Sequence, residues 1–190
     1  LVVELCSPVV PLYAADVTVD TSVPAGNRPT LDTTRNGITI INLSTVTARG
    51  VSYNKFKNYN VGTKGIILNN SKNMGVSVLG GSVYGNPNYQ SNGREASIVI
   101  NEVTGTKRSN IFGCTEMFGK SAEFILVNPN GILLNGAGFI NIPRATISTG
   151  TPVFNGDSFS RLNINGGSVI VEGDGIDAGD VGDAATGGKD

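Results

Sequence analysis

The side chains of this sequence that are suited to acid–base chemistry are the glutamates in its middle part. Glu95, Glu102, Glu116 and Glu123 follow one another at intervals of seven or fourteen residues. Such spacing can place two carboxylates on one face of a coiled chain, and paired carboxylates cleave glycosidic bonds. The alternative function is therefore a carbohydrate-active parallel β-helix enzyme, a polysaccharide lyase or hydrolase, with Glu102, Glu116 and Glu123 as acid, base or calcium ligands. We favour the simpler interpretation that these carboxylates face solvent or cap turns.

Other catalytic chemistry lacks the residues it needs. The sequence has no histidine, which excludes a Ser-His-Asp triad, a Cys-His pair and histidine metal ligands. Its two cysteines, Cys6 and Cys114, are too few for a zinc site. Neither a phosphate-binding loop nor a dinucleotide-binding fingerprint is present. We therefore expect no enzyme activity, no cofactor, no metal and no small-molecule substrate.

Charge is low and evenly spread along the chain. The 14 Lys and Arg against 15 Asp and Glu give a net charge of −1, and only 15% of residues are charged. A chain without a basic patch has no electrostatic reason to bind nucleic acid or an anionic membrane. The absence of Trp also gives little support to a sugar-binding platform. The 26 glycines instead predict many turns.

The two ends of the chain differ in composition from its middle. Residues 1–15 (Leu1–Ala15) are apolar and end in small residues, which is typical of the end of a secretory signal peptide cleaved near Ala14 or Ala15; an N-terminal strand is the alternative. Cleavage would leave Cys114 alone, and we expect it to be a small buried residue. Residues 172–190 (Glu172–Asp190) are acidic and Gly-rich and predict a solvated tail where a longer protein was truncated. Calcium binding by this tail stays open.

Between these ends, short apolar runs alternate with Asn, Gly and Pro corners. Asn-Gly occurs six times, and both residues tolerate the left-handed backbone of a sharp corner. β-branched residues dominate the apolar runs, and none of the runs shows a helical period. The predicted strands are Ile38–Leu43, Gly65–Leu68, Val76–Leu79, Ser97–Val103, Phe124–Val127, Ile132–Leu134, Phe139–Ile142, Ala145–Ser148, Phe159–Ile164 and Ser168–Val171.

Strands of this length at such short intervals favour a coil over a stack of hairpins. A hairpin sandwich is the structural alternative, because Asn-Gly also forms hairpin turns, but it would be unusually small. We predict an all-β domain over residues 16–171, a right-handed parallel β-helix of short three-sided coils. Short strands in Val17–Asn36 are expected to cap its N-terminal end. Residues 84–94 (Tyr84–Arg94) are too polar for a coil strand and predict an excursion.

Two Asn-Pro-Asn motifs mark corners of this coil. They are Asn86-Pro87-Asn88-Tyr89 and Asn128-Pro129-Asn130-Gly131-Ile132. Proline fixes φ, and each asparagine side chain can bond nearby backbone, so a turn is the simplest role. We expect Asn60, Asn69 and Asn135 to stabilise the coil. The polar residues after Tyr89 predict that its ring lies flat on the surface with its hydroxyl in water.

The order of these motifs resembles the filamentous-haemagglutinin N-terminal secretion domain family, which serves two-partner secretion in Gram-negative bacteria. The resemblance covers residues 17–150. Its blocks are Asn36–Leu43, Gly50–Tyr59, Asn60–Asn70, Gly85–Tyr89, Ile100–Gly105, Ser109–Gly119 and Glu123–Gly150. The chain departs from the family pattern at Tyr89, where Leu is usual, and at Tyr53, where His is common.

The resemblance implies an interaction module and not an enzyme. Its partner would be an outer-membrane β-barrel transporter of the TpsB type, whose periplasmic POTRA domains recognise the module. The Asn-Pro-Asn motifs would be required for export, either by forming the fold or by direct contact. The domain would be monomeric, would reach the cell surface or medium via the periplasm, and would nucleate β-helix folding there. The whole protein would be a contact-dependent inhibition toxin, an adhesin or a haemolysin.

Overall fold

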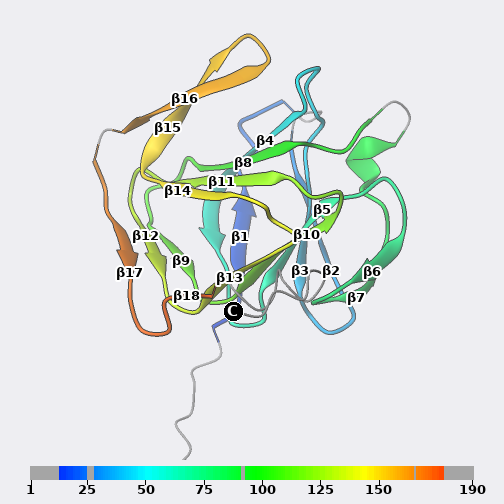
Figure 1. Cartoon of the computed structure of the whole chain (residues 1–190), viewed down its shortest axis with the longest axis horizontal. Helices are drawn as coiled ribbons and strands as arrows, with labels where there is room; N and C mark the ends of the chain where they lie inside the picture. The colour runs from blue at the N-terminus through cyan, green and yellow to red at the C-terminus, as the bar shows by residue number, and fades with distance from the viewer. Residues whose placement is uncertain (1–12, 25–27, 91–92, 165, 178–190) are drawn as a thin grey trace, which may run out of the picture.

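In the computed structural model the chain winds into a coil whose sides are three sheets (Figure 1). The structure describes residues 13–24, 28–90, 93–164 and 166–177. Most of the predicted leader, Cys6, and the end of the tail lie outside these residues. So do Asn92 and Asn165, the first residues of two of the Asn-Gly pairs.

The three sheets contain fourteen strands. The first sheet has the order β1 (Asp16–Val19), β4 (Val51–Asn60), β8 (Ile98–Val103), β11 (Glu123–Val127), β14 (Ala145–Ser148). The second has the order β18 (Ile176–Asp177), β13 (Ala137–Ile140), β10 (Cys114–Gly119), β5 (Ile66–Asn70), β3 (Thr39–Asn42), β2 (Thr30–Thr33). The third has the order β17 (Val169–Val171), β12 (Ile132–Leu134), β9 (Ser109–Ile111).

Successive strands of the chain visit the first, third and second sheets in turn. β8, β9 and β10 form one coil, and β11, β12 and β13 form the next. Each strand therefore pairs in parallel with its counterpart one coil away: Leu126 lies between Asn101 and Ile147. Glycines with positive φ stand at several corners, such as Gly65 and Gly131, because L side chains rarely adopt that conformation. The parallel β-helix predicted from the sequence is confirmed.

The coil is filled by aliphatic and aromatic side chains from all three sheets, including Phe56, Leu68, Phe124 and Leu134. Two antiparallel hairpins cover the outer faces of two sheets. β6 (Gly75–Ser77) and β7 (Gly81–Val83) lie over the second sheet. β15 (Gly150–Asn155) and β16 (Ser158–Ile164) lie over the first, where Phe154 and Phe159 pack. Strands buried on both faces read as continuous apolar runs, which explains why Phe124–Val127 has no alternation.

Two strands cap the N-terminal end of the coil, as predicted for Val17–Asn36. β1 runs antiparallel to the second half of β4, with Val17 opposite Tyr59. β2 runs antiparallel to β3, with Leu31 opposite Ile41. All other pairings within the three sheets are parallel. A stack of coils would otherwise expose its first strands to pairing with other chains.

Two predicted coil strands are wrong. Val76–Leu79 contributes to β6 and to the turn after it, and Phe159–Ile164 lies in β16, so both belong to hairpins outside the coil. Apolar residues in these segments cover the outer faces of sheets instead of filling the interior. Asn155-Gly156 is accordingly part of a hairpin turn and not a coil corner. Burial alone does not distinguish the two environments.

The predicted excursion at Tyr84–Arg94 is present but starts earlier. The chain leaves the coil after β5 and forms the β6–β7 hairpin. A single 3₁₀ turn, η2 (Pro87–Tyr89), comes next, before the chain returns to β8. Within the described residues this turn is the only helical element, and no helix there has the length and apolar character to cross a membrane.

Candidate functional site

The first asparagine of Asn128-Pro129-Asn130 points into the coil. Asn128 directly follows β11 and is completely buried. Its amide nitrogen donates to the carbonyl of Lys107 and to the hydroxyl of Ser109, both at 3.0 Å. Its Oδ1 accepts the N–H of Asn130 at 2.9 Å, which closes a turn around the exposed proline. The motif thus forms a corner and fastens it to the preceding coil.

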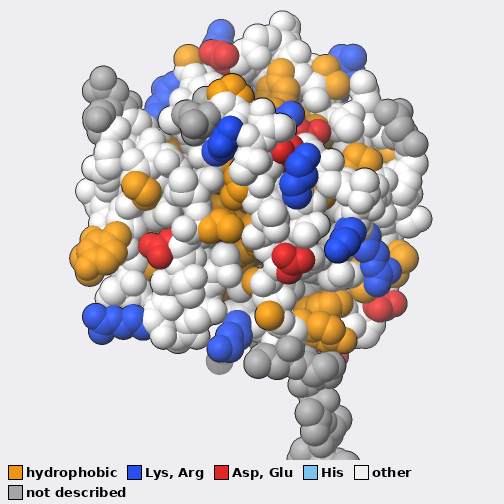
Figure 2. Space-filling view, turned by 180° about the vertical axis from the view of Figure 1, so that it is seen from behind, with side chains coloured by type: hydrophobic (Ala, Val, Ile, Leu, Met, Phe, Trp, Pro, Cys, Tyr) orange, Lys and Arg blue, Asp and Glu red, His pale blue; other side chains and the backbone are white. Residues whose placement is uncertain are grey.

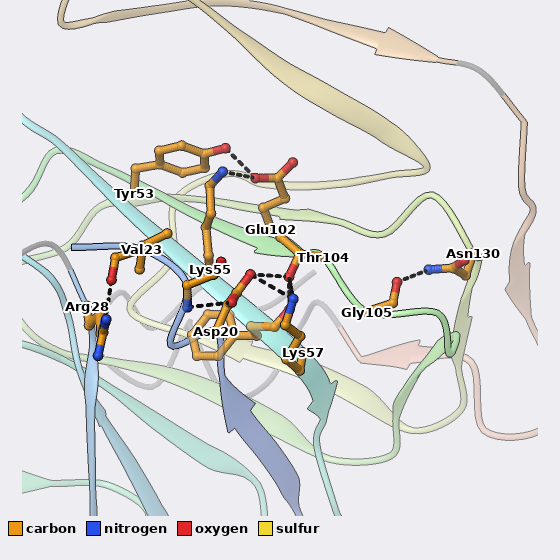
Figure 3. Close-up of polar contacts among 12 residues, drawn as sticks. Asp20, Val23, Arg28, Tyr53, Lys55, Lys57, Glu102, Thr104, Gly105 and Asn130 are labelled. Atoms are coloured by element: carbon orange, nitrogen blue, oxygen red, sulfur yellow. Dashed lines mark hydrogen bonds and ion pairs between the residues drawn. The ribbon is translucent and has the colours of Figure 1, made fainter. Parts of the chain in front are cut away.

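Asn130, Gly131 and Ile132 also hold this corner against neighbouring coils. The Asn130 amide donates to the carbonyl of Gly105 at 2.8 Å (Figure 3). Gly131 has a φ of 107°, and a Cβ there would lie 3.1 Å from the Ser168 carbonyl oxygen. Ile132 then enters β12 and is buried. The positive φ and the close approach of the Ser168 backbone together explain why glycine occupies this corner.

Asn86-Pro87-Asn88 repeats the arrangement 42 residues earlier. Asn86 is completely buried and donates to the carbonyls of Leu43 at 3.0 Å and Asn69 at 2.9 Å. Its Oδ1 accepts the Asn88 N–H at 2.9 Å, and the Asn88 amide also reaches the Leu43 carbonyl at 3.0 Å. Both motifs therefore place one asparagine inside the fold and a proline on the surface. Their amides can organise backbone but offer no group for covalent chemistry.

Tyr89 does not lie on the surface, and that prediction is wrong. Its ring is completely buried in the main core, and its hydroxyl donates to Asn70 Oδ1 at 3.1 Å. In a 3₁₀ turn, side chains three residues apart point the same way. Asn86 and Tyr89 therefore both point inward, while Pro87 and Gln90 are exposed. Burial raises the pKa of the Tyr89 phenol far above its ordinary value.

Asn70 is a further structural asparagine that sequence reasoning missed. It is completely buried, and its amide donates to the carbonyls of Ala96 at 3.0 Å and Lys120 at 2.8 Å. Its Oδ1 accepts the Ala96 N–H at 2.8 Å as well as the Tyr89 hydroxyl. Asn70 thus joins the end of β5 to the returning excursion and to the next coil. Its position directly after an apolar strand is the signal that could have identified it.

The three asparagines expected to stabilise the coil each bond to a neighbouring coil. Asn69 is buried, whereas Asn60 and Asn135 are half-buried. The bonds are Asn60 Oδ1 with the N–H of Asn110 at 2.8 Å, the Asn69 amide with Asn42 Oδ1 at 2.8 Å, and Asn135 Oδ1 with the N–H of Asp174 at 3.0 Å.

The glutamates of the alternative function do not converge. Glu102 lies at the end of β8 and Glu123 at the start of β11, so they occupy opposite ends of the same sheet. Glu102 accepts the Tyr53 hydroxyl and pairs with Lys55 at 3.4 Å (Figure 3). Glu123 pairs instead with Arg144 at 3.5 Å. Each carboxylate is held by its own partners.

Glu116 is buried under the β6–β7 hairpin on a different sheet. Its carboxylate accepts the Ser77 hydroxyl at 2.6 Å and the N–H groups of Val78 at 2.9 Å and Leu79 at 3.0 Å. Such a fully used carboxylate fixes a turn. Among the described residues, no three acidic or Cys side chains form a group suited to a metal. Cys114, expected to be buried, is half-buried and forms no disulfide.

Asp20 fastens the N-terminal cap to the coil. It follows β1, is almost completely buried, and accepts the Thr104 hydroxyl at 2.6 Å and the Ser22 N–H at 3.0 Å (Figure 3). Lys57 lies 3.1 Å from the same carboxylate. The hydrogen bond from Thr104 is the main cause that holds the Asp20 pKa well below its ordinary value, and Ser22 and Lys57 add to it.

This lowered pKa predicts acid sensitivity of the cap. A carboxyl whose pKa is depressed by folding stabilises the native state above its unfolded pKa of about 3.9, and that contribution is lost as the pH falls below it. We expect Asp20→Asn to lower the free energy of unfolding near neutral pH, measured by urea titration. The difference from wild type should narrow below about pH 4. A difference in unfolding free energy that stays the same at low pH would contradict this prediction. Asp32→Asn, at an exposed aspartate, is the control and should leave stability nearly unchanged at both pH values.

Known proteins share the sequence pattern of this chain. A family model described as "TPS secretion domain" matches residues 15–190. Over 171 residues the chain is 43% identical to the 16S rRNA endonuclease CdiA of Enterobacter cloacae subsp. cloacae, covering 89% of this chain and 5% of that protein. Over 184 residues it is 37% identical to the tRNA nuclease CdiA-2 of Burkholderia pseudomallei, covering 95% and 6%.

A solved structure shares the fold. The crystal structure of the filamentous hemagglutinin secretion domain matches with a TM-score of 0.76 and 34% identity, covering 85% of this chain and 51% of that chain. The right-handed parallel β-helix predicted from the sequence is thereby confirmed. The matches define a secretion domain and not a catalytic one.

The chain belongs to the TPS secretion domain family. Such domains serve two-partner secretion systems, in which the partner is an outer-membrane transporter. They occur in exoproteins of Gram-negative bacteria that are secreted or exposed at the surface. The chain spans about 5% of the length of the curated relatives it matches. The nuclease names of these relatives describe the whole proteins.

Proposed function

We propose that this domain is recognised by the periplasmic POTRA domains of its cognate outer-membrane transporter and directs a longer exoprotein through it. The chain would cross the inner membrane unfolded, pass through the periplasm and fold as it emerges. The domain is proposed to act as a monomer. The observation that carries the proposal is the three-sided parallel coil, shared with a secretion domain at 34% identity.

The coil also supports a role in nucleating the folding of the downstream part of the exoprotein. Each coil closes locally and docks on its neighbour, so folding can proceed in one direction along the chain. In the described residues the last strands leave apolar side chains exposed, at 43% for Val169, 54% for Val171 and 42% for Ile176. These side chains offer a surface on which a further coil can stack.

The Asn-Pro-Asn motifs would serve export by forming the coil. Asn86 and Asn128 have no exposed surface in the folded domain, so a transporter could contact these side chains only before the domain folds. In the folded domain Pro87, Pro129 and Asn130 remain exposed and are parts of the motifs that a partner can contact. Asn60, Asn69 and Asn135 would support the same coil through their bonds to neighbouring coils.

The parent protein is proposed to be a contact-dependent inhibition toxin, with an adhesin or a haemolysin as the other possibilities. Relatives named CdiA, including the Toxin CdiA of Escherichia coli at 42% identity over 172 residues, support the first. The carbohydrate-active enzyme is not favoured, because Glu102, Glu116 and Glu123 lie apart and are used by other contacts.

Co-purification tests the recognition step. The 190-residue chain should be retained on the immobilised periplasmic domains of the transporter encoded beside its gene. Periplasmic domains of an unrelated two-partner system, at equal concentration, are the control. Equal retention on both, or on neither, would contradict specific recognition.

A further inference from the structure

Two polar side chains lie inside the coil without a partner. On the face shown in Figure 2, charged side chains of both signs are scattered among uncharged ones, so the interior carries the more unusual feature. Tyr59 of β4 is 1% exposed and belongs to the main core, and Asn101 of β8 is completely buried. Within the described residues, neither the Tyr59 hydroxyl nor either end of the Asn101 amide has a hydrogen-bond partner.

The Tyr59 hydroxyl and the Asn101 amide lie close together. Burial raises the pKa of the Tyr59 phenol far above its ordinary value, and the Asn101 amide is near enough to act in the opposite direction. Their contact does not have the geometry of a hydrogen bond. One bond between them would satisfy only one end of the amide, because an asparagine side chain has both a carbonyl acceptor and an NH₂ donor. An unpaired polar group is therefore inherent in this pair.

Asn54 shows the contrast in the preceding coil. It lies beside Asn101 in the pairing of β4 with β8 and is equally buried. Its Oδ1 accepts the Ser44 N–H at 2.8 Å, and its amide donates to the Ile100 carbonyl at 3.3 Å. The other neighbour of Asn101 in the sheet is Leu126, whose side chain offers no polar group. The same residue type is thus bonded in one coil and unpaired in the next.

Unpaired polar groups in the interior oppose folding. Such groups give up their hydrogen bonds to water when they are buried, and they gain none from the protein in return. An apolar side chain at the same place would not incur this cost. Tyr59 and Asn101 therefore disfavour the closed coil that they help to fill.

The pair lies where the second coil docks on the first. β8 pairs with β4 in parallel, and the contacting residues Asn54 and Ile100 are 46 residues apart in the chain. Parallel pairing over such a separation is slow, because the intervening chain must be ordered first. Water must also leave Tyr59 and Asn101 before the two coils can close on them. We expect this loss of water to raise the barrier to docking.

We propose that Tyr59 and Asn101 delay the docking of the second coil on the first and so help to keep the chain unfolded while it passes through the periplasm. This inference rests on the proposed function, in which the chain meets the transporter before it folds. The pair acts on the timing of folding and needs no contact with a partner. Asn128 acts at the opposite end of the route, because its bonds stabilise the coil after the chain has emerged.

Refolding of the purified 190-residue chain tests the delay. Asn101→Val removes the unpaired amide and should refold about three to ten times faster than wild type, because valine loses no hydrogen bonds to water on burial. A brief unfolding pulse before refolding prevents proline isomerisation from setting the rate.

Matched controls isolate the unpaired groups. Asn54→Val makes the same substitution at the bonded position and should not refold faster. Tyr59→Phe should also accelerate refolding, whereas Tyr89→Phe removes a hydroxyl that is bonded to Asn70 and should not.

Export of the exoprotein tests the consequence of faster folding. Asn101→Val should release less exoprotein into the medium than wild type, because more of it folds before it reaches the transporter. Protease resistance of the periplasmic fraction measures how much of the domain has folded there, and this fraction should rise. Asn54→Val should show no such rise.

The outcomes separate this inference from the proposed function. Unchanged or slower refolding of Asn101→Val overturns the inference, and so does faster refolding with normal export. If Asn101→Val does not fold, Tyr59→Phe decides by the same criteria, because it removes a single oxygen atom. Wild type that is not exported through its cognate transporter overturns the proposed function and this inference together.

Discussion

Tyr89→Ala is expected to lower the free energy of unfolding by about 3–5 kcal/mol, the range for truncating a buried aromatic residue. The ring has no exposed surface and lies among the side chains that fill the coil. Truncation also removes one of the two hydrogen bonds that Asn70 Oδ1 accepts. Urea titration or thermal unfolding of the purified chain measures the loss.

Two further variants divide this effect into its parts. Tyr89→Phe removes only the hydroxyl and should cost about 0.5–1.5 kcal/mol, the net contribution of one hydrogen bond, because Asn70 Oδ1 still accepts the Ala96 N–H. Tyr89→Leu restores the residue usual in the family, but it should also destabilise this chain, because its core is shaped around a ring. Tyr84→Ala, at an exposed tyrosine, is the matched control. A Tyr89→Ala variant as stable as the Tyr84 control would contradict the enclosed ring.

Asn128→Ala should lower the free energy of unfolding by about 1–3 kcal/mol, the scale for leaving buried polar groups unpaired. The substitution removes the donor to the Lys107 carbonyl and the Ser109 hydroxyl. It also removes the acceptor that closes the turn at Asn130. Export of the exoprotein into the medium should fall in step with stability.

Asn130→Gly provides a graded comparison, because Asn130 is exposed and its amide bonds mainly to the Gly105 carbonyl. We expect it to reduce both stability and export, but by less than Asn128→Ala. Pro129→Ala tests the exposed part of the motif. Loss of export by Asn128→Ala with unchanged thermal stability would show direct recognition by the transporter and would contradict a role in folding.

Much of the coil can be predicted from local sequence because each corner is determined by nearby residues. Ile132–Leu134 and Ala145–Ser148 have the bounds predicted for them. Both lie between corners marked by Asn, Gly or Pro. The first capping strand is equally predictable, because its alternating sequence suits an edge strand, and β1 alternates exposed with half-buried residues. Local turn chemistry and burial agree in these segments.

The two hairpins could not be distinguished from coil strands in the sequence, because a coil strand and a strand that covers a sheet need the same apolar side chains. Phe159 packs on the outer face of the first sheet as Phe124 packs inside it. Strands that mix polar and apolar residues, such as β10, are also missed. Glu116 of β10 is buried because the β6–β7 turn supplies hydrogen-bond donors to its carboxylate. Such donors come from residues distant in sequence and leave no local signal.

The site is predictable as motifs but not as contacts. Asn-Pro-Asn indicates a turn, and the turns are present in both copies. The inward direction of Asn86 and Tyr89 depends on the 3₁₀ geometry of the turn, which the polar residues after Tyr89 obscure. The groove of about 750 Å³ between β2 and the β6–β7 hairpin could not be predicted, because it is formed by a cap and an excursion that meet only in the folded chain.

Export of a fused reporter tests the central claim most directly. Residues 1–190, joined behind a functional signal peptide and ahead of an otherwise periplasmic reporter, should carry the reporter into the medium. This export should require both the domain and the cognate transporter. Deleting either should leave the reporter in the periplasm, and an unrelated transporter should not replace the cognate one. Equal export without the domain would contradict the account.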